Sequence, residues 1–142
     1  MAFIENQPTV TLIAETTFSA SDLHKFLAIS TATARVSIVE STAPHRVIGT
    51  LLSETYSTST GADESVTVGL LQGIGKVYML TSTETAGSPI GCSTNGFGVI
   101  ASATTDTLQL GYIVEGSSGG TGRIVSVLFQ LPTTPPSTAA GF

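Results

Sequence analysis

The apolar residues of this chain occur in short runs, and this spacing constrains its fold more than any other feature. Runs rich in Val, Ile and Leu alternate with clusters of Gly, Ser, Thr, Asn, Asp and Pro, and no run keeps helical periodicity beyond about two turns. A length of 142 residues makes one domain the default. The sequence therefore predicts an all-β domain, a small barrel or sandwich of short strands joined by turns.

The expected strands are apolar or alternating runs bounded by turn residues. We expect them at residues 25–29, 35–39, 47–54, 65–71, 76–80, 98–101, 109–115 and 123–130. The first pair is predicted to form a hairpin. A single turn of helix is expected within residues 19–24, where Ser or Asp can cap it. Residues 86–89 are expected to break the chain, and Cys92 to fill a glycine-rich turn.

Two parts of the sequence resemble each other. Ile48–Glu54 and Leu110–Gly116 share the pattern apolar-Gly-x-apolar-apolar, and in both cases a polar loop and a second β-run follow. Neither half has enough apolar surface to offset the entropy lost on ordering, so the halves should pack into one core. Gly49 and Gly111 occupy matching positions and are predicted structural glycines, placed where the sheet coils sharply and where no β-branched residue is tolerated.

These patterns predict a domain organisation with two extensions. The β-domain is expected at residues 19–131, built from two similar units at about 20–80 and 86–131. Residues 1–18, which contain Pro8 followed by a β-prone run, are expected to form an extended N-terminal arm. Residues 132–142 are Pro/Thr-rich and are expected to form a flexible tail. The terminal Phe142 is open to two interpretations, an exposed tip or a docking anchor.

The charge balance disfavours nucleic acid as a partner. Lys and Arg number 5 against 10 Asp and Glu, the net charge is -5, and no basic cluster occurs. Binding to DNA or RNA depends on gathered cations that neutralise phosphates. No apolar run approaches the roughly 18 residues of a membrane span, and the first residues lack the pattern of a secretory signal. We therefore expect no nucleic-acid or membrane partner, and synthesis in the cytosol.

No set of residues in the sequence is typical of a catalytic or metal site. Cys92 is the single cysteine, which excludes an internal disulfide and a CxxC metal site. His24 and His45 have no carboxylate at metal-ligand spacing, and Asp63-Glu64 is an ordinary polar loop pair. The glycine-rich loops lack the Lys and the helix that a phosphate site needs. The sequence predicts a protein that is not an enzyme, with no catalytic, cofactor-binding or metal site.

Several segments together are similar to one known family. Ala86–Ala101 (AGSPIGCSTNGFGVIA), Leu110–Glu115 and Ile124–Leu128, separated by a glycine-rich loop, resemble the capsid decoration, or cement, proteins of tailed bacteriophages. The first half, through residues 22–28, 47–52 and 66–71, looks like the same unit. The resemblance covers residues 20–131 and rests on apolar patterns and turn glycines.

This resemblance implies a fold, a location and partners. The family's fold is a compact β-barrel or β-tulip-like domain, often a trimer, with an arm that reaches onto the major capsid protein. The chain is then a structural protein of the virion that binds the outside of the major capsid protein lattice and stabilises the mature head. A homo-oligomer, with a trimer favoured, is expected.

The arm is the part expected to bind the capsid. Its apolar residues are suited to adding a strand to an exposed edge of the capsid protein. They are Phe3, Ile4, Val10, Leu12 and Ile13. Deletion of residues 1–17 is expected to leave a folded domain that no longer binds capsids.

Two other classes of function stay open. A receptor-binding or fibre-associated β-module of a virion has the same Ser/Thr-rich, all-β character. The absence of Trp and the presence of only 3 Tyr disfavour it, because sugar sites usually stack on these rings. A small hydrolase of a phage particle is the third class, and the missing acid, base and nucleophile set disfavours it.

Overall fold

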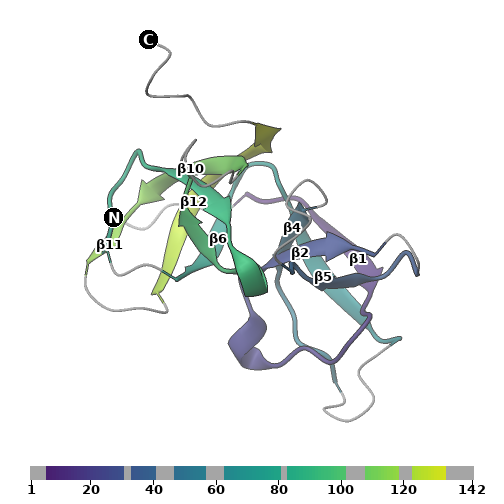
Figure 1. The fold of residues 1–142 in the computed structure, drawn as a ribbon. Helices are drawn as coiled ribbons and strands as arrows, with labels where there is room; N and C mark the ends of the chain where they lie inside the picture. The colour runs from purple at the N-terminus through teal and green to yellow at the C-terminus, as the bar shows by residue number, and fades with distance from the viewer. Residues whose placement is uncertain are drawn as a thin grey trace.

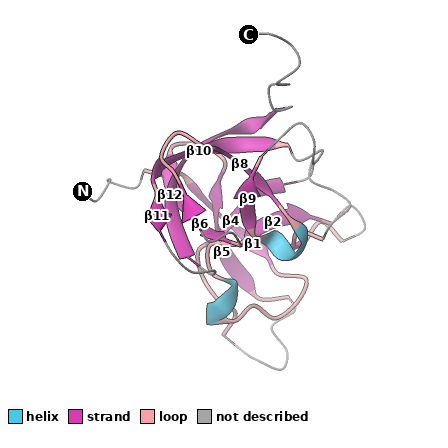
Figure 2. Ribbon diagram, turned by 60° about the vertical axis from the view of Figure 1, so that its left-hand side comes forward, coloured by secondary structure: helices cyan, strands magenta, loops and turns pink. Residues whose placement is uncertain are grey.

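The fold of this chain is all-β, as the sequence predicts. The computed structural model describes residues 6–30, 33–40, 47–56, 63–80, 83–101, 108–118 and 123–133. Phe3, Ile4, His45, Phe142 and most of the predicted tail lie outside the described residues. Within those ranges the regular structure consists of strands and two short 3₁₀ turns (Figure 2). One of these turns, η1 (Ala20–Asp22), falls within the predicted residues 19–24.

The first unit is a five-stranded antiparallel sheet with the order β1-β5-β4-β2-β3. Its strands are β1 (Thr9–Ile13), β2 (Phe26–Ile29), β3 (Val36–Ile38), β4 (Val47–Leu51) and β5 (Ser65–Leu70). The predicted hairpin is confirmed, because β2 pairs with β3. A parallel bridge between Ala14, which follows β1, and Val36 joins the two edges of the sheet.

The second unit is a closed barrel with the order β10-β12-β6-β9-β8. Its strands are β6 (Ile74–Met79), β8 (Pro89–Cys92), β9 (Gly98–Ile100), β10 (Gln109–Glu115) and β12 (Arg123–Thr133). The parallel pair between Met79 and Gly98 closes it. A small ribbon of β7 (Thr83–Glu84) and β11 (Ser117–Ser118) and the 3₁₀ turn η3 (Thr94–Gly96) complete this half. The two units lie side by side (Figure 1).

The two units repeat one topology. Taken in chain order, β1 to β5 correspond to β6, β8, β9, β10 and β12, and every antiparallel pairing and the single parallel contact recur. The register also recurs: Gly49 lies opposite Leu70, and Gly111 lies opposite Phe129. The repeat seen in the sequence therefore coincides with a repeat of strand pairing.

The bounds of the units differ from the predicted ones. The first copy begins with β1 at Thr9, not near residue 20, and the strand at residues 74–79 opens the second copy instead of closing the first. The reason is pairing: β1 lies against β5, and β6 lies against β12. The sequence similarity is visible only in the later strands of each unit, so it could not reveal the first strand of either.

The predicted arm is extended but is not separate from the domain. Residues 9–13 form a ladder with β5, and the alternate side chains of Val10 and Leu12 pack against the core of the first unit. Ala14 and Phe18 are fully buried there. An alternating apolar strand next to an unpaired edge of its own sheet pairs with that edge, which corrects the boundary predicted at residue 18.

Strand β8 was not predicted. Its sequence, Pro-Ile-Gly-Cys, combines two residues that usually interrupt strands, but Pro is tolerated at the first position of a strand. Cys92 therefore lies in a strand and not in a turn, and its side chain is buried in the barrel. Burial raises the pKa of the Cys92 thiol to about 12, so the thiol is neutral at physiological pH.

Strand β2 joins the two cores, because both of its faces are buried. Leu27 faces the core of the first unit, while Phe26 and Ala28 face the core of the second. The Phe26 ring meets the Phe129 ring edge-on, with centroids 6.4 Å apart. The second core consists of Phe26, Ala28, Val39, Val47, Leu71, Val77, Met79, Ile90, Cys92, Leu110, Ile113, Val125, Val127 and Phe129. One face of the first unit thus covers the core of the second.

The residues before β1 also tie the units together. The Gln7 side chain donates hydrogen bonds to Thr50 Oγ1 at 3.2 Å and to the Leu70 carbonyl at 2.9 Å. It fills space left by glycines, since a Cβ atom at Gly69 or Gly75 would lie 2.3 Å from a Gln7 side-chain atom. The Gln7 side chain therefore contacts residues of both units: Gly69 and Leu70 at the end of the first, and Gly75 at the start of the second.

We expect Gln7→Ala to lower the free energy of unfolding by about 1–2 kcal/mol, because two hydrogen bonds are lost and a partly buried acceptor is left unsatisfied. Urea denaturation measures this. Gln72→Ala is the matched control; its side chain is exposed, and its effect should stay within about 0.5 kcal/mol. Equal denaturation midpoints for the two variants would contradict the role given to Gln7.

Gly49 and Gly111 have no room for a side chain. A Cβ atom would lie 1.8 Å from the Gly69 carbonyl oxygen at Gly49, and 2.3 Å from the Leu128 carbonyl oxygen at Gly111. We expect Gly111→Val to prevent folding or to cost at least about 3 kcal/mol, because the obstructing atom is backbone. Gly87→Ala is the control: the site has open space but a φ of +88°, so the expected cost is only about 1–2 kcal/mol. A wild-type melting temperature for Gly111→Val would refute this account.

Candidate interaction surfaces

Metal-binding side chains do not gather in the part of the chain that the structure describes. No group of three or more His, Cys, Asp or Glu residues there could hold a metal ion. A groove of about 360 Å³ at the end of β12 is lined by Leu71, Gln72, Phe129, Gln130 and Leu131, none of which is ionisable. Among the described residues, no helix has the length and apolar character needed to cross a membrane.

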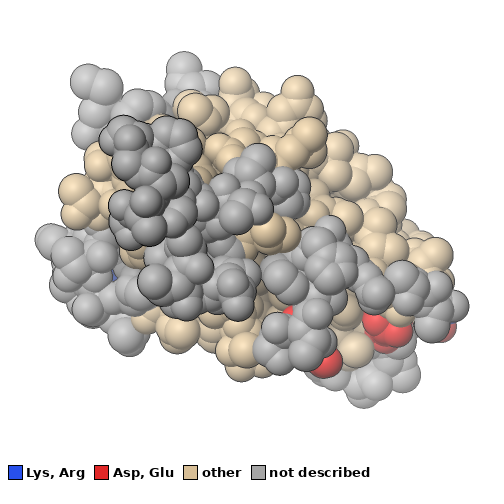
Figure 3. Space-filling view, turned by 45° about the horizontal axis from the view of Figure 1, so that its top comes forward, with Lys and Arg blue, Asp and Glu red and all other residues tan. Residues whose placement is uncertain are grey.

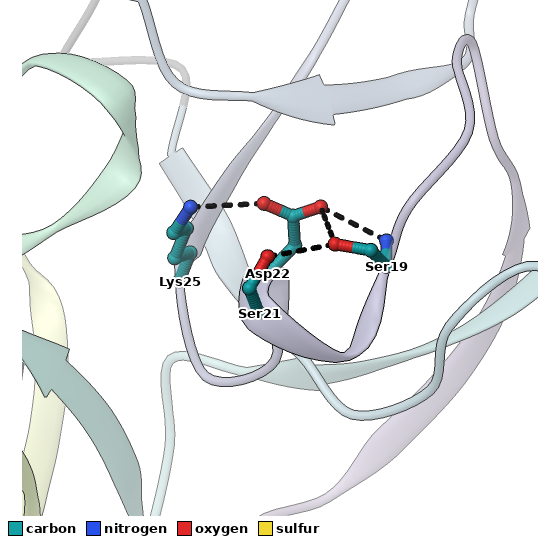
Figure 4. Close-up of polar contacts among 4 residues, drawn as sticks. All are labelled: Ser19, Ser21, Asp22 and Lys25. Carbon is teal, nitrogen blue, oxygen red and sulfur yellow. Dashed lines mark hydrogen bonds and ion pairs between the residues drawn. The ribbon is translucent and has the colours of Figure 1, made fainter.

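A cluster of polar side chains, Ser19, Ser21, Asp22 and Lys25, surrounds η1 (Figure 4). Asp22 Oδ1 accepts a hydrogen bond from Lys25 Nζ at 2.9 Å, and Asp22 Oδ2 accepts from the backbone N–H of Ser19 at 2.9 Å. Lys25 Nζ also lies 4.8 Å from the centroid of the Phe97 ring, which belongs to the second unit. The cluster therefore positions η1 against the second unit, and its groups are engaged with one another.

Two opposing effects act on the pKa of Asp22. Burial by itself raises this pKa, but the hydrogen bonds from Lys25 and Ser19 and the charge of Lys25 outweigh it, so the pKa lies below its usual 3.8. The carboxylate form is thus favoured by the folded state.

The outer edge of β1 is the first candidate contact surface. The Pro8 carbonyl accepts from Leu70 N–H, and Ala14 N–H donates to the Glu64 carbonyl, so the even-numbered residues bond to β5. In an antiparallel ladder the odd-numbered residues 9, 11 and 13 then direct their N–H and C=O groups away from β5. Among the described strands none pairs with this edge at residues 9–11, whereas from Ile13 onward the same edge meets β3 through the Ala14–Val36 bridge. The edge carries no charged side chain. Such an edge can accept an added strand.

Of the predicted arm residues, the structure brings only Ile13 to the surface. Its side chain is 40% exposed. Val10 and Leu12 pack inward and support the fold. Phe3 and Ile4 lie outside the described residues, so their contact with a capsid stays a prediction.

The second candidate surface is a row of apolar side chains on the outer face of the second unit. Pro89, Tyr112, Leu128 and Ile74 are direct neighbours across β8, β10, β12 and β6. Tyr112 is 41% exposed and Leu128 is 46% exposed. We call these four residues the outer row. Grouped exposed apolar side chains are typical of contact surfaces. Sequence reasoning missed the row, because an apolar residue in a strand cannot be assigned to the inner or outer face before its neighbours are known.

Negative charge is concentrated on the first unit. Its described carboxylates are Glu15, Asp22, Glu40, Glu54, Asp63 and Glu64, and its described cations are Lys25 and Arg35. The second unit has Lys76 and Arg123 with Glu84 and Glu115. On the face in Figure 3, acidic side chains lie toward one end, and most described atoms belong to uncharged residues. The second unit thus offers the less acidic surface.

The altered pKa of Asp22 gives a pH-dependent prediction. We expect Asp22→Asn to be less stable than the wild type at pH 7, and the difference to shrink as the pH falls through and below 3.8, where protonation removes the ion pair. Urea denaturation midpoints at several pH values measure it. Glu54→Gln is the control, because Glu54 is exposed and the substitution removes one negative charge without breaking the Asp22–Lys25 pair. A difference that grows on acidification would contradict the role given to Asp22.

Comparison with known proteins shows a shared fold. No family model matches the chain, and no curated protein matches it. Among solved structures, the chain is similar to the N base of head fiber gp8.5 of bacteriophage phi29, with a TM-score of 0.58 and 17% sequence identity. The match covers 92% of this chain and 100% of that chain. At this identity the similarity establishes the architecture, and it extends over both units.

Proposed function

We propose that this chain is a structural protein of a bacteriophage virion, held on the outside of the head by the major capsid protein, where it decorates and stabilises the mature lattice. The observation that carries the proposal is the fold, shared over 92% of the chain with the base of a phage head fibre. The resemblance of residues 20–131 to phage cement proteins leads independently to the same location. On this proposal the chain binds, and it catalyses no reaction.

The contact with the capsid protein is assigned to the outer edge of β1. Main-chain groups of residues 9 and 11 would supply hydrogen bonds to an added strand, and the exposed side chain of Ile13 would supply an apolar contact. Phe3 and Ile4, which precede this strand in the sequence, are proposed to extend the same contact. Val10 and Leu12 are not part of it, because they face the core.

The proposed assembly is a homotrimer. Several copies of a weak contact held in one particle raise the effective concentration of each remaining contact, so modest edges can bind firmly. The surface suits this role: Ser and Thr are frequent, and only 11% of residues are charged. Ordering short hydroxyl side chains at an interface costs less entropy than ordering Lys or Glu.

The base of a head fibre is the second candidate function. The similarity of the fold to the base of a phage head fibre favours it. A fibre base and a decoration protein are both attached to the head. They differ in the number of copies on each head and in how far the bound protein projects from it. A decoration protein occupies the lattice at a fixed ratio to the capsid subunits. A fibre base carries mass that projects from the head.

Co-sedimentation of the purified chain with undecorated expanded phage heads tests the proposal. Saturable binding at a fixed ratio to the capsid subunits supports decoration. Binding at fewer fixed sites, with projecting density in electron micrographs of complete virions, supports the fibre base. Absence of binding to heads would overturn attachment to the capsid in either form.

The substitution Thr11→Pro probes the strand edge without removing β1. Pro lacks an N–H group, and at residue 11 the lost N–H is directed away from β5, so an edge strand should tolerate the change. We expect a folded protein whose affinity for heads falls at least about ten-fold. The reason is that the contact loses one or two hydrogen bonds and gains a clash with the proline ring. Leu12→Pro is the matched control, since it removes an N–H directed toward β5 and should lower the melting temperature.

Wild-type affinity of folded Thr11→Pro for heads would contradict the role of this edge. The deletion of residues 1–17 considered from the sequence is no longer a suitable test. It removes β1 with Ala14, which is fully buried, and so would disrupt the first core together with any binding surface. Deletion of residues 1–5 is suitable instead, because it leaves Gln7 and β1 in place.

A further inference from the structure

The outer row of the second unit has a counterpart in the first unit. In the repeated register, Pro89, Tyr112, Leu128 and Ile74 correspond to Phe26, Thr50, Gly69 and Thr9, which are neighbours across β2, β4, β5 and β1. Both rows lie at the same positions of the same topology. Their surroundings can therefore be compared position by position.

Three residues of the first unit's row are covered by the rest of the chain, and the fourth, Thr9, is exposed. Phe26 and Thr50 are fully buried. Phe26 packs against Phe129 of the second unit, and the Gln7 side chain lies over Gly69 and bonds to Thr50. A unit of the same fold therefore covers this face at Phe26, and Gln7, which precedes β1, covers it at Thr50 and Gly69.

The row of the second unit is uncovered and apolar. Tyr112 is 41% exposed to solvent, and Leu128 is 46% exposed. The described residues form no further unit over this face, and the face is more apolar than its counterpart, which contains Thr50, Gly69 and Thr9. An exposed face of this kind is typical of a surface that is buried on association.

We propose that the outer row is the docking surface for the first unit of a second copy of this chain, in a head-to-tail arrangement. The occupant follows from the internal repeat, because the equivalent face is covered by a unit of this fold. Charge agrees with this choice. The outer face of β6 and β12 adds Lys76 and Arg123, with Glu115 on β10, whereas the described first unit has six carboxylates and two cations.

A head-to-tail contact uses two different surfaces, so it repeats until a ring closes. The inference rests on the self-association included in the proposed function and names the surface responsible. It is independent of the capsid contact, which is assigned to the edge of β1 on the first unit. The outer row comprises other residues, on other strands.

The mass of the full chain in solution, measured by light scattering over a concentration series, tests the inference. We expect the wild type to form a closed oligomer with one fixed number of subunits, so that its mass is a single whole multiple of the mass of the chain. We expect Tyr112→Ser combined with Leu128→Ser to remain folded, since both side chains point away from the core, and to reduce the association constant at least ten-fold. Leu131→Ser is the matched control; this residue is 77% exposed on the second unit outside the row, and the mass of the variant should equal that of the wild type.

A wild type that is monomeric at every concentration, or a folded double variant with unchanged mass, would overturn the inference. Head binding is then measured separately. A double variant that is monomeric and still binds heads supports the inference and the capsid contact together. An oligomeric wild type that fails to bind heads overturns the proposed function and leaves the inference standing. A monomeric wild type whose binding to heads is lost in the double variant would make the outer row a capsid contact, which also overturns the inference.

Discussion

The burial of both faces of β2 is the constraint on which the rest of the structure depends. Leu27 completes the core of the first unit, while Phe26 and Ala28 complete that of the second, so neither core is closed without the same four-residue strand. This strand reads as a continuous apolar run, the pattern expected when a strand has no face toward water. Gln7 and the pair Asp22–Lys25 then fix the joint from its two sides. We expect the two units to unfold together, because separating them exposes Phe26 and Phe129 at once.

Repetition of one topology explains how the two units stabilise each other. Five strands with one parallel contact form a unit whose outer face needs cover, and the second copy supplies that cover to the first. Among the described residues, the outer row of the second unit stays exposed, and the edge of β1 at residues 9–11 has no partner strand. On the proposed function both would serve as contact surfaces. The low content of charged side chains keeps the entropy cost of such contacts small.

Much of the fold could be predicted from local patterns. The hairpin of β2 and β3, and the matching positions of Gly49 and Gly111, follow from alternation and from the repeat in the sequence. Strand β8 was missed because Pro89 and Gly91 are usual strand breakers, and their tolerance depends on where the strand begins and on what packs against it. The candidate site was less accessible. The alternating arm predicted a contact surface, but the side chains of Val10 and Leu12 are used by the domain itself.

The sequence by itself determined the all-β class, the presence of two similar units and the low charge of the surface, because these depend on residue type and on spacing along the chain. Only the tertiary structure decided which strands pair across the units, that β1 completes the first sheet, and that Tyr112 and Leu128 point outward. The physical reason is the two-residue period of a strand. Alternation says which side chains share a face, but the burial of that face depends on a partner that lies far away in the sequence.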